Sequence, residues 1–158
     1  MAEDHDHFMG LCIAESKKAG ELGNVPVGSI VVRDGKVVGV GGNAVSSETD
    51  PTAHAEVMAV RDACRNLGST DLTGATLYTA MEPCPMCCWA IKAANIGRLV
   101  LGARHAAMKR LDYGDYSVEK LLDMTLQSLD IVTGVRVEEC EAMRRSWLGH
   151  AASLQPPR

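Results

Sequence analysis

Two short segments decide how this chain is interpreted: His54-Ala55-Glu56 and, further along, Pro83-Cys84-Pro85-Met86-Cys87. One imidazole and two thiols are a typical protein ligand set of a catalytic zinc site, because they leave one tetrahedral position open. The alternatives are a structural zinc site, which normally has four protein ligands, and a redox cysteine pair. The pattern therefore predicts Zn²⁺ held by His54, Cys84 and Cys87. Glu56 is left as the catalytic group that moves protons.

Both segments are expected at the beginning of a helix. Asp50-Pro51 has the pattern of an N-cap followed by the first helical residue, and Gly68 is the expected end of that helix. Pro85 likewise marks the first position of a second helix, with Cys84 as its cap. His54 and Glu56 are two positions apart and share no helix face. Their side chains can therefore converge only beyond the N-terminal end, toward which Cα–Cβ bonds point.

The pattern of apolar residues around these segments predicts an α/β fold. Helices are expected over residues 8–22, 51–67, 85–95, 118–124 and 137–148, and strands over 25–32, 36–40, 76–80, 99–101 and 129–135. Asp34-Gly35 between the first two strands is a strong indication of a hairpin. This order predicts a central sheet with helices on both faces. The long connection over residues 103–128 permits a parallel arrangement of the last two strands.

Composition sets limits on the class of protein. The 158 residues, 46% hydrophobic and 23% charged, predict one domain over residues 1–150 and a disordered tail over 151–158. No apolar run approaches the ~20 residues that span a bilayer, and the acidic start is unlike a signal peptide. Six cysteines then favour metal binding and free thiols over disulfides. We expect a cytoplasmic protein without a membrane partner.

Residues from about Val25 to Gly102 resemble the cytidine deaminase superfamily. The similarity is greatest to the branch of guanine deaminases, yeast-type cytosine deaminases and bacterial tRNA adenosine deaminases. It is carried by Pro26-Val27-Gly28, Gly42-Asn43, the run from Asp50 to Glu56, Leu77-Tyr78, the run from Glu82 to Cys87, and Gly102-Ala103-Arg104. The resemblance implies a three-layer α/β/α sandwich with a five-stranded mixed sheet and hydrolytic deamination. It also implies zinc on the three residues above, Glu56 as proton shuttle, and a homodimer or larger assembly.

Four further residues are predicted to contact the substrate. Asn43 matches the base-binding Asn of this branch, although after two glycines it is equally a turn residue. Ala55, between the two motif side chains, is expected beside the substrate. Asp115 corresponds to the place where guanine enzymes have an Asp that reads the base, and its alternative is a loop or helix-cap role. Trp147 either closes a small pocket, as an aromatic residue does in cytosine deaminases, or packs in the core.

The favoured functional hypothesis is deamination of a free nucleobase of the guanine, cytosine or isocytosine type. The net charge of −4 and the short clusters Lys109-Arg110 and Arg144-Arg145 make nucleic acid an unexpected partner, although a local basic patch is possible. The alternative is a tRNA-specific adenosine deaminase, because residues 134–140 resemble the C-terminal part of those enzymes. A non-enzymatic, zinc-stabilised interaction subunit is a third hypothesis, and the presence of Glu56 argues against it.

Overall fold

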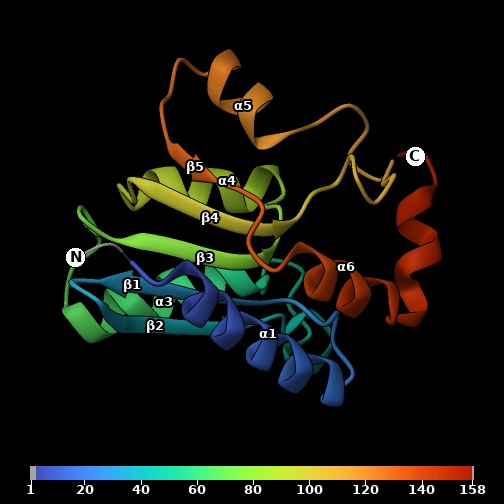
Figure 1. Ribbon diagram of the computed structural model, residues 1–158, viewed down its shortest axis with the longest axis horizontal. Helices are drawn as coiled ribbons and strands as arrows, with labels where there is room; N and C mark the ends of the chain where they lie inside the picture. Colours follow the sequence, from blue (N-terminus) through green and yellow to red (C-terminus); the bar gives the residue numbers. More distant parts are fainter. Residues whose placement is uncertain (1–2, 158) are drawn as a thin grey trace.

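The computed structural model describes residues 3–157 and contains a five-stranded sheet between two layers of helices (Figure 1). The expected three-layer α/β/α sandwich with a mixed sheet is confirmed. The strands are β1 (Gly28–Arg33), β2 (Lys36–Gly42), β3 (Thr76–Met81), β4 (Arg98–Ala103) and β5 (Asp130–Val132). The helices are α1 (His5–Glu21), α2 (Val45–Glu48), α3 (Ala55–Leu67), α4 (Pro85–Ala93), α5 (Val118–Met124), α6 (Val137–Arg145) and the 3-10 helix η1 (Leu148–Leu154).

The strand order β2-β1-β3-β4-β5 combines antiparallel and parallel pairs. β1 is antiparallel to both β2 and β3, whereas β3, β4 and β5 run parallel. The predicted hairpin joins β1 to β2, and both of its turn residues have positive φ, 51° at Asp34 and 72° at Gly35, as a type I′ turn requires. Because β3 and β4 are parallel, their carboxyl ends lie at the same edge of the sheet, next to the start of α4.

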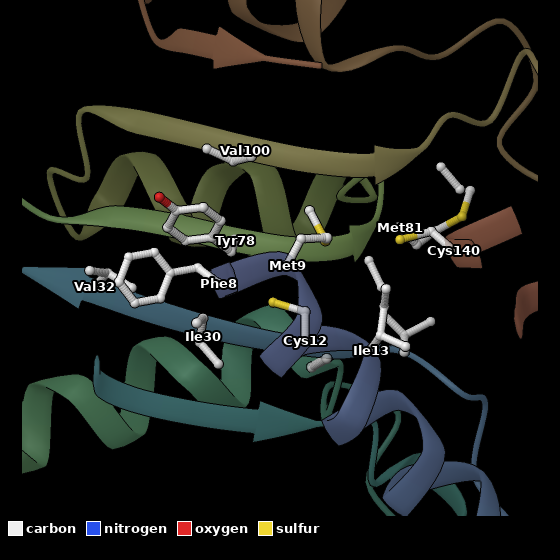
Figure 2. Packing of buried hydrophobic residues seen from close by; sticks show 14 of the residues in the cluster. Phe8, Met9, Cys12, Ile13, Ile30, Val32, Tyr78, Met81, Val100 and Cys140 are labelled. Atoms are coloured by element: carbon white, nitrogen blue, oxygen red, sulfur yellow. The ribbon is translucent and has the colours of Figure 1, made fainter. Parts of the chain in front are cut away.

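The two faces of the sheet bury separate cores, as the period of two along a strand dictates. Ile30, Val32 and Tyr78 point toward α1, where Phe8 and Met9 cover them (Figure 2). Their neighbours on the same strands, such as Val31 and Leu77, pack in the other core with α3 and α4. α6 shares the first face with α1, and α5 packs beside α4 on the second.

α3 lies unusually close to β2, because glycines occupy the contact. A Cβ atom at Gly39 would meet the backbone of Ala59 and Ala63, and one at Gly41 would meet the backbone of Ala55 and Ala59. No other residue type allows this approach without displacing the helix. The two glycines therefore fix the height of the first turn of α3 above the sheet.

The start of α3 differs from the expectation. The helix begins at Ala55 with His54 as its N-cap, so the predicted cap at Asp50 is wrong. The Asp50 carboxylate instead accepts hydrogen bonds from the backbone N–H of Thr52 at 2.8 Å and from its hydroxyl at 2.7 Å. That local turn satisfies the side chain before the helix starts. The short helix α2 was not anticipated from the sequence.

The C-terminal region is more ordered than expected. α6 ends at Arg145, and η1 crosses the expected boundary at residue 150. The carbonyl of Ser153 accepts hydrogen bonds from the backbone N–H groups of Leu111 (2.8 Å) and Asp112 (3.2 Å), so η1 is tied to the connection between β4 and α5. Arg158 lies outside the described residues, and the division into domain and tail stays a prediction. Within residues 3–157, no helix is long and apolar enough to cross a membrane.

Gly41→Ala is expected to lower the free energy of unfolding by about 1–3 kcal/mol, because the new methyl group overpacks the β2–α3 contact. Gly97→Ala is the matched control, since a Cβ there meets nothing within 4 Å and its φ is not positive. Urea unfolding followed by circular dichroism measures both changes. Equal stability of the two variants would contradict the close approach of α3 to β2.

Candidate active site and metal centre

Three side chains at the carboxyl end of β3 are grouped in a way that fits a zinc ion. The Nδ1 atom of His54 lies 3.5 Å from Cys84 Sγ and 3.4 Å from Cys87 Sγ, and the two sulfurs are 3.5 Å apart. Ligands of a tetrahedral zinc, with Zn–S near 2.3 Å and Zn–N near 2.0 Å, should lie about 3.5–3.8 Å from one another. Among residues 3–157, this is the only group of three or more such side chains that could hold a metal ion.

Two helix N-termini bring these ligands together. His54 is the N-cap of α3 and Cys84 the N-cap of α4, with Pro85 at the first helical position. The backbone N–H of Cys87 points at Cys84 Sγ from 3.5 Å. Hydrogen bonds from Cys87 and His54 lower the pKa of the Cys84 thiol to about 4. The partial positive charge of the helix end acts in the same direction, so the site favours the thiolate that a metal needs.

Glu56 lies two positions after His54, in the first turn of α3, and is only 4% exposed. Its Oε1 accepts a hydrogen bond from the hydroxyl of Thr79 on β3, at 3.0 Å. Burial raises the pKa of the Glu56 carboxyl above its ordinary value. A carboxyl group in this environment is suited to take up and release a proton, as general acid–base catalysis requires.

His54, Glu56 and Cys84 line a cavity of about 320 Å³. This volume is at the lower end of the ~300–1,000 Å³ range of small-molecule sites. Val25, Val27 and Met81 contribute apolar surface, while His54, Glu56 and Cys84 bring the reactive groups. Asn43, Ala55 and Glu82 also line the cavity. The remaining lining residues form what we call the C-terminal wall: His105, Arg110, Asp112, Tyr113, Arg144, Trp147, Gly149, Ala152 and Ser153. The cavity therefore combines a chemical centre from the first two thirds of the chain with a wall from the last third.

The predicted substrate-contacting residues do not all reach this cavity. Asn43, Ala55 and Trp147 line it. Asn43 also accepts a hydrogen bond from the N–H of Val45 at 3.2 Å, so it forms a turn while facing the cavity. Asp115 does not line it, because its side chain is 98% exposed and pairs with Lys120. The substrate roles of the first three residues stay predictions.

Glu82 is a structural residue whose role the sequence did not reveal. Its buried carboxylate accepts hydrogen bonds from the guanidinium of Arg104 and from the backbone N–H groups of His105 and Val118, both at 3.0 Å. It thus holds together the end of β4, the following connection and the start of α5. The sequence identified Glu82 only as part of a motif, since its partners lie more than twenty positions away.

Three charged residues of the C-terminal wall were likewise missed as cavity residues. Arg110 and Asp112 form an ion pair at 2.5 Å, and the guanidinium of Arg144 lies 4.7 Å from the centre of the Trp147 ring. In the sequence, these arginines belong to two short basic clusters, Lys109-Arg110 and Arg144-Arg145, with no sign that they face a cavity. The fold turns them inward because η1 folds back over the connection that carries Arg110.

Several curated proteins that resemble the chain carry the names of tRNA-modifying enzymes. A tRNA-specific adenosine deaminase of Agrobacterium fabrum is 47% identical over 104 residues, which are 66% of this chain and 68% of that protein. Other bacterial relatives carry the same name. A solved structure described in terms of A-to-I editing by tRNA:A34 deaminases has a TM-score of 0.77 at 37% identity, covering 87% of this chain and 98% of its own.

A guanine deaminase structure from Bacillus subtilis is also similar, with a TM-score of 0.62 at 38% identity, and covers 65% of this chain and 66% of its own. The curated relatives nevertheless contradict the favoured hypothesis of a free-nucleobase enzyme in base salvage, and the expectation that nucleic acid is not a partner. That expectation relied on the net charge of the whole chain, which does not measure the local charge at a cavity. The homodimer stays a prediction.

The family is established by the part of the chain that carries the metal group. Residues 2–103 match the model of the cytidine and deoxycytidylate deaminase zinc-binding region. This segment ends with β4 and includes both helix N-termini, Glu56 and the strand that supports it. The chain belongs to the cytidine and deoxycytidylate deaminase family of zinc-binding deaminases.

Proposed function

We propose that this chain is a zinc-dependent deaminase that converts adenosine to inosine in a tRNA anticodon loop. The observation that carries the proposal is the metal group beside the buried Glu56 in a small cavity, in a chain whose bacterial relatives are tRNA-specific adenosine deaminases. His54, Cys84 and Cys87 hold the zinc ion. Glu56 is the proton-transfer group, and Asn43 contacts the base.

The chemistry is hydrolysis at C6 of the purine ring, with water as the nucleophile and ammonia as the leaving group. A bound Zn²⁺ supplies Lewis-acid activation of the water at neutral pH. Glu56 accepts one proton of the water and delivers it to ring N1; it then takes the proton of the hydroxyl group added at C6 and delivers it to the amino group, which leaves as ammonia while the C6 carbonyl forms. Thr79 keeps the carboxylate in place through the 3.0 Å hydrogen bond to Oε1.

The size of the cavity supports a substrate that enters as a single nucleotide. About 320 Å³ accommodates one nucleotide unit and not a folded loop. An enzyme that acts on a base in RNA extrudes that nucleotide from its stack into such a pocket. The rest of the RNA then lies on the outer surface, where the overall negative charge of the protein matters less than the local charge near the opening.

The zinc-loaded protein is expected to form inosine in an anticodon stem-loop RNA with adenosine at the wobble position. Free adenine, guanine and cytosine should react at least about a hundredfold less efficiently, because they lack the phosphate contacts that dominate affinity for RNA. Inosine formation and ammonia release, measured side by side, give the comparison. An RNA with guanosine at the same position serves as the control. Turnover of free guanine without RNA deamination would overturn the proposal.

Cys87→Ala is expected to lose bound zinc together with activity, since no other thiol or imidazole is placed to replace the lost ligand among the described residues. Cys88→Ala is the matched control. Cys88 is the next residue along α4, and it packs in the core with Ile91 and Leu101 and away from the metal group. Metal analysis of the purified proteins should give full zinc in the control. Full zinc occupancy in Cys87→Ala would refute the ligand assignment.

Glu56→Gln is expected to keep zinc and fold but to reduce kcat by about 10²–10⁴-fold, the usual contribution of a general acid–base group. The amide has the same shape and cannot carry the proton. Glu48→Gln on the exposed helix α2 is the control and should retain full activity. Single-turnover kinetics on the stem-loop RNA measure the effect. Activity within tenfold of the unchanged protein would assign the proton transfers to another residue.

A further inference from the structure

Arg144 is a buried cation without a counter-ion in the structure. It lies in the last turn of α6, is 4% exposed and lines the cavity. Its guanidinium stacks on the Trp147 ring at 4.7 Å, and Nη1 lies 3.3 Å from Nδ1 of His150. Among residues 3–157, no carboxylate forms an ion pair with it. A buried charge is costly unless a partner of opposite charge is supplied.

Other arginines in the described chain have a carboxylate as their partner. Arg104 pairs with Glu82 and Glu119, and Arg145, the next residue along α6, pairs with Glu141 at 3.1 Å. Arg110, the other arginine of the C-terminal wall, pairs with Asp112 at 2.5 Å. Among residues 3–157, Arg144 is therefore the charged group of this wall that has no partner of opposite charge.

The charge of the C-terminal wall also favours an anion. Arg110 and Arg144 carry two positive charges against the one negative charge of Asp112. Burial lowers the pKa of Arg144 to about 10, which still leaves the guanidinium charged at neutral pH. Burial lowers the pKa of His105, on the same wall, to about 4, so that imidazole adds no charge. The C-terminal wall therefore carries a net charge of about +1.

We propose that Arg144 binds a phosphate group of the substrate nucleotide, so that the cavity recognises a phosphorylated nucleoside and not a base alone. The inference rests on the proposed function for the identity of the base, and on the geometry of Arg144 for the phosphate. The flat guanidinium fork matches two phosphate oxygens. The Trp147 ring lies against the guanidinium at 4.7 Å and His150 contacts Nη1, so both help to fix its position on the cavity wall. Phosphate thereby supplies the counter-ion that residues 3–157 do not.

The phosphate can come from an RNA backbone or from a free mononucleotide. Both present the same oxygens to the guanidinium, and the experiment separates them by substrate. Three small ligands, adenosine, adenosine 3′-monophosphate and adenosine 5′-monophosphate, are compared with the anticodon stem-loop RNA. Binding is measured by calorimetry on the zinc-loaded protein, and turnover by inosine formation, each over a range of salt concentrations.

Arg144→Gln is expected to raise KM for the stem-loop by about tenfold or more, with kcat little changed, because charge-assisted contacts to phosphate act on binding. The slope of log(kcat/KM) against log salt should become less steep by about 0.7, the value for one phosphate contact on a single strand. Arg144→Lys should keep that slope. The control is Arg145→Gln, which removes an equal charge from the same turn and should leave both quantities unchanged. An unchanged KM and slope in Arg144→Gln would overturn the proposal.

The comparison of ligands tests the proposed phosphate site even if Arg144→Gln fails to fold. At low salt, the unaltered protein should bind at least one adenosine monophosphate about tenfold more tightly than adenosine, and high salt should remove this preference. Equal affinity for adenosine and both monophosphates would overturn the phosphate site. If the RNA is not deaminated but the phosphate preference is observed, the proposed function fails while the phosphate site stands.

Discussion

The structure depends on the meeting of two helix N-termini at one end of the sheet. α3 and α4 come from separate βα connections, yet their cap residues, His54 and Cys84, must approach within 3.5 Å. Gly39 and Gly41 allow α3 to lie directly on β2, and the parallel pair of β3 and β4 places the start of α4 beside it. A shift of about 1 Å in either helix would separate the ligands, because zinc tolerates little variation in distance.

Much of this centre could be predicted from the sequence, because its determinants are local. Hairpin residues Asp34 and Gly35, the proline after Cys84 and the alternation within β1 and β3 each act within a few positions. The position of α3 was predicted four residues too early, since an aspartate before a proline is a good cap in isolation. The Asp50 side chain can either cap a helix or accept a hydrogen bond from Thr52 in its own turn, and it does the latter. The sequence pattern does not show which of these two arrangements is more stable.

The C-terminal third resisted prediction because its contacts join distant parts of the chain. The last helix was expected to extend to residue 148, but α6 ends at Arg145, and Trp147 follows it and lines the cavity. The hydrogen bonds from Leu111 and Asp112 to Ser153, which fold η1 over the site, have no counterpart in local sequence. For the same reason the sequence did not reveal that Asp112 lines the cavity while the side chain of Asp115 is exposed.

Two consecutive parts of the chain form the cavity, and this division affects how the substrate of such an enzyme can change in evolution. The segment that matches the family ends at residue 103, and it contains the metal group and Glu56. The C-terminal wall follows it and shares no residue with that centre. The reaction chemistry is thus encoded in the first stretch of the chain, while a large part of the cavity surface is encoded in the second. Substitutions after β4 can therefore change which substrate fits the cavity while the metal ligands and Glu56 stay the same.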